Sequence, residues 1–311
     1  MDVMVIFQTM IKLLLILILG FVLNKIHILD AQTNQRLSNL IVTVTTPMLV
    51  ISSVCGLDDS VSRLSVLPLL LGGFGLYLGF ILFGELACRL PIFKKENRGP
   101  NACMMVFPNS GFMGIPVMQS IYGTNAVFYN SILNFPYNIF IYTYALLRLG
   151  SGKNADGTKQ KISLRSILTP GFVMVFLALI LFLTGLTLPQ VIVDTCDMVG
   201  GITSPLSMLV LGSTIAMYPL KESLKDPRCY LFALFRLFII PMATLGVCRL
   251  FQIDNFITGI AVLSAAMPVG SMVLIMCGRC GGNTELVSRN TLVTTLLSVI
   301  TIPVVAAVLA L

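Results

Sequence analysis

The apolar segment 101–121 is long enough to cross a bilayer, yet its centre, FPNSGFMGIP at 107–116, cannot continue an α-helix. This stretch holds two prolines and two glycines, and each proline removes a backbone hydrogen bond and clashes with the preceding turn. In hydrocarbon, such a break is tolerated only where protein buries the freed backbone or the backbone lines a cavity. Asn109 and Ser110 lie inside the break. The sequence therefore places polar groups at the depth of the membrane centre.

A second break, AMPVGS at 266–271, interrupts another apolar segment later in the chain. Paired broken helices in corresponding places of two halves are the best sequence indication of a transporter's binding site. Each break leaves free N–H groups and a positive dipole end on the downstream half-helix, and these favour anions such as carboxylates. The alternative is that the polar groups only satisfy each other's backbones. The substrate-binding residues predicted at the two breaks are Asn109, Ser110, Gly111, Gly114, Val269, Gly270 and Ser271.

Glycine and proline within the breaks have specific expected roles. Gly111, Gly114 and Gly270 are predicted to allow close backbone approach between the two crossing chains, because glycine has no Cβ. Pro116 is expected to open the half-helix after the first break, since proline suits the first position of a helix.

Composition places the chain in a membrane. Its residues are 56% hydrophobic and only 11% charged, with a mean hydropathy of +0.94, whereas a soluble domain carries about 25% charge. We therefore predict an all-α integral membrane protein with ten transmembrane helices. The ten predicted spans are 4–23, 37–55, 64–88, 101–121, 125–147, 164–184, 191–216, 229–250, 256–277 and 286–310.

A polar stretch after the fifth span divides the chain into two halves. It is rich in Gly, Lys and Asn, which predicts a flexible cytoplasmic linker at 150–163, between a first repeat at 1–149 and a second at 164–311. Five spans per half is an odd number, so the second half enters the membrane in the opposite orientation. This predicts an inverted-topology repeat. The motifs TTP at 45–47 and TSP at 203–205 precede the two breaks in the same order.

Loop charges predict the orientation. Sixteen of the twenty Lys and Arg residues lie in the loops after the odd-numbered spans, and only Arg63 and Arg249 lie on the opposite side. Because cytoplasmic loops carry the excess of positive charge, we expect both termini to be extracytoplasmic, in a multi-pass protein of the cell membrane. The same distribution explains the net charge of +7 without nucleic acid as a partner.

Three charged residues inside predicted spans could have a functional role. Lys12, near the centre of the first, is a functional candidate by default, either neutralising a bound anion or replacing a coupling cation; the alternative is a side chain that snorkels to the surface. Arg236 poses the same choice, with pairing to a carbonyl or a lipid headgroup favoured. Glu85 is expected to pair with Arg89 at i,i+4, with a proton-carrying role as the alternative.

The fifth span carries three amides, Asn130, Asn134 and Asn138, spaced to share one face of a continuous helix. Interhelical hydrogen bonds often explain such residues. A stripe of this length favours a pathway lining, so Asn134 and Asn138 join the predicted substrate site. Lys12 joins it as a charge that could neutralise a bound anion.

The sequence gives no indication of enzyme activity. The one histidine, His27, falls in a cytoplasmic loop, and no catalytic signature is present, so we predict no catalytic residue, metal or cofactor. The eight cysteines are scattered and do not form a disulfide framework. A channel or a non-transporting ligand sensor on the same scaffold remains open.

The segment NSGFMGIP resembles the N-x-G-x-x-G-(I/L)-P signature of the auxin efflux carrier family, which includes plant auxin exporters and bacterial organic-acid permeases. Weaker resemblances run along the whole chain, including Ile28-Leu29-Asp30 in the first loop and Pro205-Leu206 in the seventh span. Leu168-Thr169-Pro170 is similar to the family's N-P-P motif, but with Thr for Asn and Gly171 for the second Pro.

The resemblance implies two inverted five-helix repeats, similar to those of bile-acid sodium symporters, with the broken fourth and ninth helices crossing at Pro108 and Pro268. A panel domain and a transport domain would move against each other, and Asn109 would meet the substrate carboxylate. The short linker resembles the bacterial members, which implies a permease for an acid such as malate or malonate. A sodium-coupled symporter of bile-acid type is the alternative. The expected partners are a small organic-acid anion and membrane lipid, and a homodimer is left open.

Overall fold

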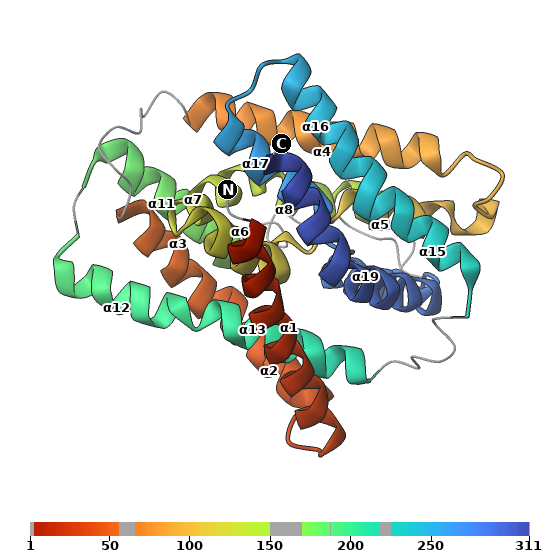
Figure 1. Ribbon diagram of the computed structural model, residues 1–311, viewed down its shortest axis with the longest axis horizontal. Helices are drawn as coiled ribbons and strands as arrows, with labels where there is room; N and C mark the ends of the chain where they lie inside the picture. The colour runs from red at the N-terminus through yellow and green to blue at the C-terminus, as the bar shows by residue number, and fades with distance from the viewer. Residues whose placement is uncertain (1–2, 56–65, 150–169, 187, 218–224, 311) are drawn as a thin grey trace. The chain divides into compact units, whose positions relative to one another are not determined.

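The regular structure of the computed structural model is helical throughout the residues that it describes, which are 3–55, 66–149, 170–186, 188–217 and 225–310 (Figure 1). The predicted linker at 150–163 lies outside these residues. In the first half of the chain the main elements are α1 (Val3–Lys25), α2 (Ala31–Leu40), η1 (Ile41–Thr45), α3 (Thr46–Cys55), α4 (Val66–Ala87), η3 (Lys95–Asn97), α5 (Arg98–Val106), η4 (Ser110–Gly114), α6 (Ile115–Tyr122), α7 (Asn125–Leu133), α8 (Phe135–Tyr142) and α9 (Tyr144–Leu149).

The regular elements of the second half of the chain are also helical. Its described elements are α11 (Pro170–Thr184), α12 (Gln190–Gly201), α13 (Thr203–Ala216), α15 (Pro227–Leu234), η5 (Phe235–Ile239), α16 (Ile240–Leu250), α17 (Asn255–Ala266), α18 (Ser271–Arg279) and α19 (Thr284–Ala310).

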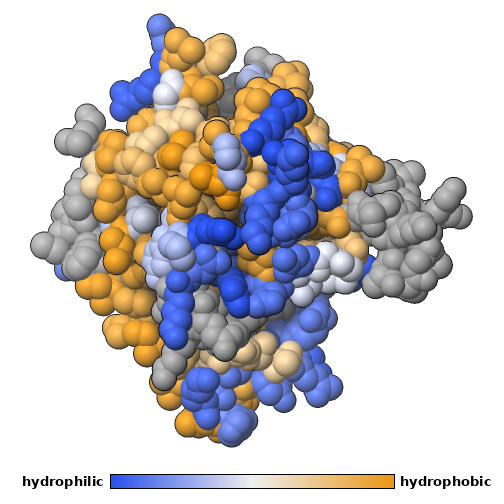
Figure 2. Space-filling model, turned by 90° about the vertical axis from the view of Figure 1, so that its right-hand side faces the viewer, coloured by the Kyte–Doolittle hydropathy of each residue, from blue (hydrophilic) through white to orange (hydrophobic). Residues whose placement is uncertain are grey.

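Five continuous helices among the described residues are long and apolar enough to cross a membrane: Ala31–Cys55, Val66–Ala87, Gln190–Ala216, Pro227–Leu250 and Thr284–Leu309. Their outward side chains are largely apolar, as on α4, where Leu67, Leu71 and Leu82 are each more than 60% exposed. Apolar side chains also cover much of the face drawn in Figure 2. A surface of this kind is unfavourable in water and suits lipid. The chain is a multi-pass membrane protein.

The three π-helical turns among the described residues have a common cause. η1, η4 and η5 each end two residues before a proline, namely Pro47, Pro116 and Pro241. In a regular α-helix, the proline ring would clash with the carbonyl four residues earlier, which is the central residue of each π-helical turn. The wider turn relieves that clash, and its N–H groups bond five residues back, as from Ile240 to Phe235. Proline therefore widens these helices without ending them.

The fifth predicted span, at 125–147, is not one helix. The structure has α7, α8 and α9 there, separated by single residues, Asn134 and Thr143. Asn134 has φ −91° and ψ 3°, outside the helical region, and it precedes Phe135-Pro136. Pro136 lacks the N–H that would continue the ladder. The expectation of one continuous face carrying three amides therefore does not hold.

The chain forms two compact units, and each draws on both halves of the sequence. The first comprises Met1–Gly72, Gly111–Phe135 and Leu168–Met217; the second comprises Gly73–Ser110, Pro136–Ile167 and Tyr218–Leu311. This is a spatial division, so the two sequence repeats at 1–149 and 164–311 stay a prediction.

Close helix packing holds the first unit together. α1 lies against α13, and α3 lies against α11 and α12. The backbones of α1 and α13 approach so closely that a Cβ on Gly20 would stand 2.1 Å from the carbonyl oxygen of Leu209. A Cβ on Gly212 would meet the carbonyl of Leu17 at 1.8 Å. Small residues permit this packing, as is common between membrane helices.

The core of the second unit gathers around the two breaks. Tyr77, Phe107 and Val269 are each fully buried there. The ring of Tyr137 stacks edge-on against Phe107, with centroids 5.3 Å apart, and against Tyr77 at 6.1 Å. Residues of both breaks therefore lie in a buried, aromatic environment.

Candidate functional site

The two predicted breaks meet in the second unit. α5 ends at Val106 and α17 ends at Ala266, and the irregular residues that follow form an antiparallel bridge between Pro108 and Val269. The N–H of Asn109 donates to the carbonyl of Pro268 at 2.8 Å, and the N–H of Gly270 donates to the carbonyl of Phe107 at 2.9 Å. Both donors and both acceptors would otherwise be unsatisfied in a dry core. Each break thus completes the backbone hydrogen bonding of the other.

Gly270 is the glycine that the bridge requires. A Cβ at this position would stand 2.9 Å from the carbonyl oxygen of Pro108 and 3.2 Å from that of Phe107. Its φ of −69° is ordinary, so the requirement is steric and not conformational. The prediction of close backbone approach at Gly270 is confirmed by this geometry.

Asn109 and Ser110 follow the bridge in the first break, and both are buried. The main chain of Asn109 is satisfied, but its side-chain Nδ2 is buried without a hydrogen-bond partner. Ser110 shares a hydrogen bond with the hydroxyl of Tyr77, on α4. A buried amide donor without a partner is costly in a native fold and is an indication of function or of an absent ligand.

Arg236 lies beside the second break. It occupies the π-helical turn η5, and its side chain is 0% exposed. Nη1 donates to the carbonyl of Ala265 at 2.7 Å, one residue before α17 ends. Nε and Nη2 are buried without partners. The pairing with a carbonyl that we favoured from the sequence is present, but it uses only part of the guanidinium.

A stripe of buried polar side chains on α19 also contacts the second break. This stripe was not predicted from the sequence. The hydroxyl of Thr294 accepts a hydrogen bond from the N–H of Val269, at 3.3 Å. The other buried members of the stripe are Asn290, Thr291, Thr295 and Ser298. Their spacing of three and four residues was the available signal, because it puts them on one face of a helix.

A pocket of about 180 Å³ opens near this stripe, within the second unit. Its lining includes Lys94, Asn101, Arg228 and Asn290. Asn290 precedes Thr294 by one helical turn, which is a rise of about 6 Å. The pocket therefore lies about one turn of α19 from the bridge, and its lining carries two basic residues and one carboxylate, that of Asp226.

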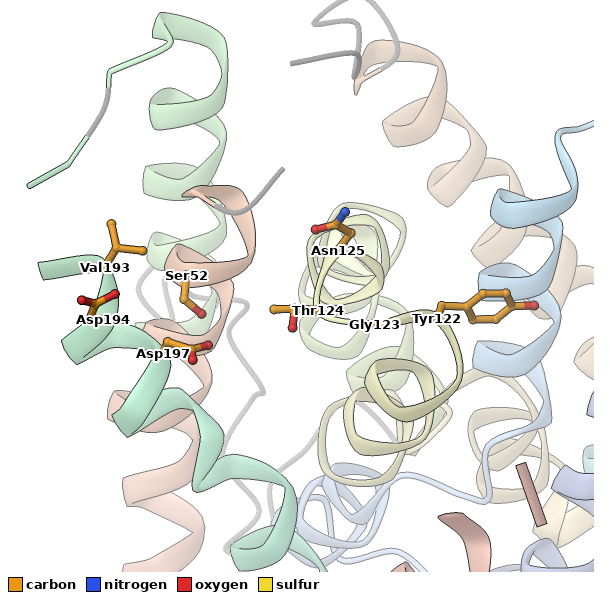
Figure 3. A pocket seen from close by; sticks show the side chains of 8 residues that line it. All are labelled: Ser52, Tyr122, Gly123, Thr124, Asn125, Val193, Asp194 and Asp197. Atoms are coloured by element: carbon orange, nitrogen blue, oxygen red, sulfur yellow. The ribbon is translucent and has the colours of Figure 1, made fainter. Parts of the chain in front are cut away.

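A larger pocket, of about 420 Å³, lies within the first unit (Figure 3). Ser52, Asp194 and Asp197 line one side of it, and Thr124 and Asn125 lie opposite, whereas the ring of Tyr122 points away. Asp194 accepts a hydrogen bond from Gln190, at 2.8 Å. Two exposed carboxylates repel an anion, so this pocket does not have the chemistry of the predicted site. No group of three or more metal-ligating side chains occurs among the described residues.

Comparison with known proteins places the chain. A family model described as "Membrane transport protein" matches residues 5–306. The chain belongs to this family, the auxin efflux carrier family. A relative from Methanothermobacter thermautotrophicus, described as an "Uncharacterized transporter", is 26% identical over 309 residues, covering 97% of this chain and 98% of the relative.

The signature of the auxin efflux carrier family, N-x-G-x-x-G-(I/L)-P, is divided by the structure. Asn109 lies next to the bridge. Gly111 and Gly114 lie in η4, where the helix resumes, and a Cβ on Gly111 would meet nothing within 4 Å. Pro116 lies beyond η4, near the start of α6, so the half-helix opens at Ser110 and not at Pro116. Close approach at the bridge is therefore a property of Gly270 and not of Gly111.

The remaining predicted members of the transporter's site are not part of the bridge itself. Nδ2 of Asn134 donates to Oδ1 of Asn130, at 2.6 Å, within the first unit. Asn138 is half-buried on α8. Lys12 is exposed on α1. Ser271 is the first residue of α18, directly after Gly270, and is half-buried.

The expected pairing of Glu85 with Arg89 was wrong. Glu85 instead forms an ion pair with Arg148, at 2.6 Å, and accepts a hydrogen bond from the Tyr144 hydroxyl at 2.7 Å. α4 ends at Ala87, so Arg89 is not on the helical face that an i,i+4 pair needs. The carboxylate thereby links α4 to α9.

Proposed function

We propose that this membrane transporter is a secondary carrier that moves a small organic anion, a carboxylate such as malate or malonate, by alternating access. The observation that carries the proposal is the bridge at Pro108 and Val269, with the unpartnered Nδ2 of Asn109 beside it. Irregular backbone at membrane depth is expected where it forms a binding site. The N-terminus of α18 begins there, at Ser271, and its dipole favours negative charge.

Reciprocal contacts support two inverted repeats. Elements related by a two-fold axis contact each other reciprocally, so that each partner uses the corresponding residue. The hydroxyl of Thr203 donates to that of Thr45, 158 residues away, at 2.9 Å, and these threonines open the TSP and TTP motifs. α1 packs on α13. If the two halves of the chain are exchanged, α1 corresponds to α11 and α13 corresponds to α3, and α11 packs on α3. The two hydrogen bonds of the bridge are related in the same way, because each break donates one N–H to a carbonyl of the other.

The pockets support the predicted alternation of the spans. In the first unit, Ser52, Thr124 and Asp194 come from three chain segments that the loop charges predict to be extracytoplasmic. In the second unit, Lys94, Arg228 and others come from three segments predicted to be cytoplasmic. Each pocket therefore collects ends assigned to one side. We assign the transport motion to the two compact units, one of which holds the whole bridge.

Counterflow tests this function. Purified protein in liposomes preloaded with malonate, L-malate, succinate or acetate is expected to accumulate the same labelled acid, with saturation and without sodium. Fast, non-saturating flux would indicate a channel instead. Sodium-dependent uptake would indicate the symporter of bile-acid type. Binding of an acid with no flux at all would indicate a sensor.

A further inference from the structure

The guanidinium of Arg236 is the one fully buried positive charge among the described residues of the second unit. Removing an arginine from water is costly unless an opposite charge compensates it. Among the described residues, Arg236 nevertheless makes one hydrogen bond, to the carbonyl of Ala265. That bond places one nitrogen at the negative end of the α17 dipole but leaves two others without partners.

No described carboxylate of the second unit is free to compensate this charge. Glu85, Glu96 and Glu285 pair with Arg148, Lys94 and Arg289. Asp226 caps the start of α15, and Asp254 caps the start of α17. These are the carboxylates in the part of that unit that the structure describes, and each is engaged elsewhere.

The two unpartnered nitrogens have a particular geometry. Nη1 is the terminal nitrogen cis to Cδ, so Nε and Nη2 lie together on the opposite edge of the planar group. Two parallel N–H donors on one edge match the two oxygens of a carboxylate, and this bidentate pairing is among the strongest hydrogen bonds in proteins. The edge of Arg236 that lacks partners is therefore the edge that binds a carboxylate side-on.

The arginine and the unpartnered amide belong to the same place. Arg236 is bonded to Ala265, and Asn109 is bonded to Pro268, only three residues later. Three residues span at most about 11 Å, even when fully extended.

We propose that the Nε–Nη2 edge of Arg236 is the subsite that binds a carboxylate group of the substrate, in one site with Nδ2 of Asn109. This inference rests on the proposed function, since it assigns charge recognition to the same site. The planar edge of Arg236 favours a carboxylate, because the two carboxylate oxygens lie in one plane and can accept both N–H groups. The pocket lined by Lys94 and Arg228 lies about one turn of α19 from the bridge. With these two basic residues and Asp226 its lining has a net positive charge, which attracts an anion on the predicted cytoplasmic side.

Two substitutions test the subsite by separating charge from geometry. Arg236→Met removes the charge, and replacing a buried unpaired ion by an apolar side chain is compatible with folding. Arg236→Lys keeps the charge but cannot donate two parallel N–H groups. Arg249→Met is the control, because Arg249 is an exposed arginine at the end of the same long helix. Titrations of purified protein with malonate, L-malate, succinate and acetate, and with their amides, give the affinities.

For wild type and Arg249→Met we expect the acid to bind more tightly than its amide. Arg236→Met should lose this preference by lowering acid affinity about ten- to a hundredfold, with amide affinity unchanged. Arg236→Lys should keep the preference with about tenfold weaker acid binding. A merely structural arginine would lower acid and amide binding together.

The outcomes separate the two proposals. A preference for acid that persists in Arg236→Met, or wild-type acid affinity in Arg236→Lys, would overturn the subsite and leave the arginine as a cap of α17. If Arg236→Met fails to fold, the lysine variant still decides. If wild type shows neither acid flux nor acid preference, the proposed function itself fails, and the subsite fails with it.

Discussion

Gly270 and Phe107 are joined by a main-chain hydrogen bond of 2.9 Å, although one follows α17 and the other follows α5. Two interrupted membrane helices thus satisfy each other through a short piece of antiparallel backbone. The pairing explains how Pro108, Pro268 and Gly270 can lie in a buried core without leaving the neighbouring backbone unsatisfied. It also makes the site sensitive to any atom added between the chains.

Gly270→Val is therefore expected to disrupt the bridge. Its Cβ would stand 2.9 Å from the Pro108 carbonyl oxygen, so the backbone must shift. Overpacking of this kind costs about 1–3 kcal/mol. Thermal unfolding and acid binding of purified protein measure the effect. Gly79→Val, at an exposed position of α4 with no neighbour within 4 Å, is the matched control. Equal behaviour of the two variants would show that the bridge tolerates separation.

Gly20→Ala is expected to destabilise the first unit. The added Cβ would stand 2.1 Å from the Leu209 carbonyl oxygen, which forces α1 away from α13. Gly246→Ala, on α16, meets nothing within 4 Å and should be neutral or stabilising by up to about 1 kcal/mol, because alanine favours the helix. Melting temperatures of the two variants in the same detergent compare them. A Gly20→Ala protein as stable as wild type would mean that α1 and α13 do not pack this closely.

The sequence predicted the breaks correctly because proline and glycine act locally. Pro108 and Pro268 cannot continue a helix whatever surrounds them. The same residue type misled in the fifth span, where three asparagines were read on one continuous face. Pro136 breaks that face at Asn134, and a periodicity argument assumes an unbroken helix. Local chemistry was thus more reliable than long-range periodicity.

Partners across the fold were not predictable from spacing. Glu85 has Arg89 four residues away but pairs with Arg148, because the helix ends first. The direction of the unpartnered edge of Arg236 depends on where α17 ends in space, which the sequence of η5 does not contain. The hydroxyls of α19 were missed because serine and threonine in apolar helices usually bond their own backbone, as Thr294 also does to Asn290.

The predicted orientation can be tested by cysteine labelling from outside the cell. Lys159→Cys lies in the predicted cytoplasmic linker and should be protected from an impermeant thiol reagent, whereas Asp2→Cys should react. The background is favourable, since seven of the eight native cysteines are buried and Cys55 is half-buried. Permeabilised cells, in which both positions should react, provide the control. The opposite pattern in intact cells would reverse the orientation and the sides assigned to both pockets.

Lys12 offers a comparison with Arg236. It is exposed on α1, where a long side chain can reach the lipid headgroups, while Arg236 is fully buried. If its ammonium group lies among the headgroups, an ion pair with the substrate contributes at most about 1 kcal/mol there. Lys12→Met should therefore lower acid affinity no more than about fivefold. A loss as large as that of Arg236→Met would place Lys12 in the site, and unchanged kinetics would leave snorkelling as its role.

Asn109→Ala tests the amide at the bridge. The backbone bond from Asn109 to Pro268 is kept, so the bridge should persist. The substitution removes the unpartnered Nδ2 donor, and a hydrogen bond to a charged group is worth about 1.5–3 kcal/mol. We therefore expect acid affinity to fall about ten- to a hundredfold. In the absence of ligand, the protein should be no less stable than wild type, because a buried donor without a partner has been removed.

Thermal shifts with an acid and with its amide give the decisive comparison for Asn109. The acid should stabilise wild type and the amide should not, because the dipole of α18 and the guanidinium of Arg236 favour negative charge. In Asn109→Ala, stabilisation by the acid should shrink, while its preference over the amide should remain, since the charge comes from Arg236. Asn134→Ala, which removes an amide already bonded to Asn130, serves as the control for losing a polar side chain. Equal stabilisation by acid and amide in all three proteins would remove anion binding from the bridge.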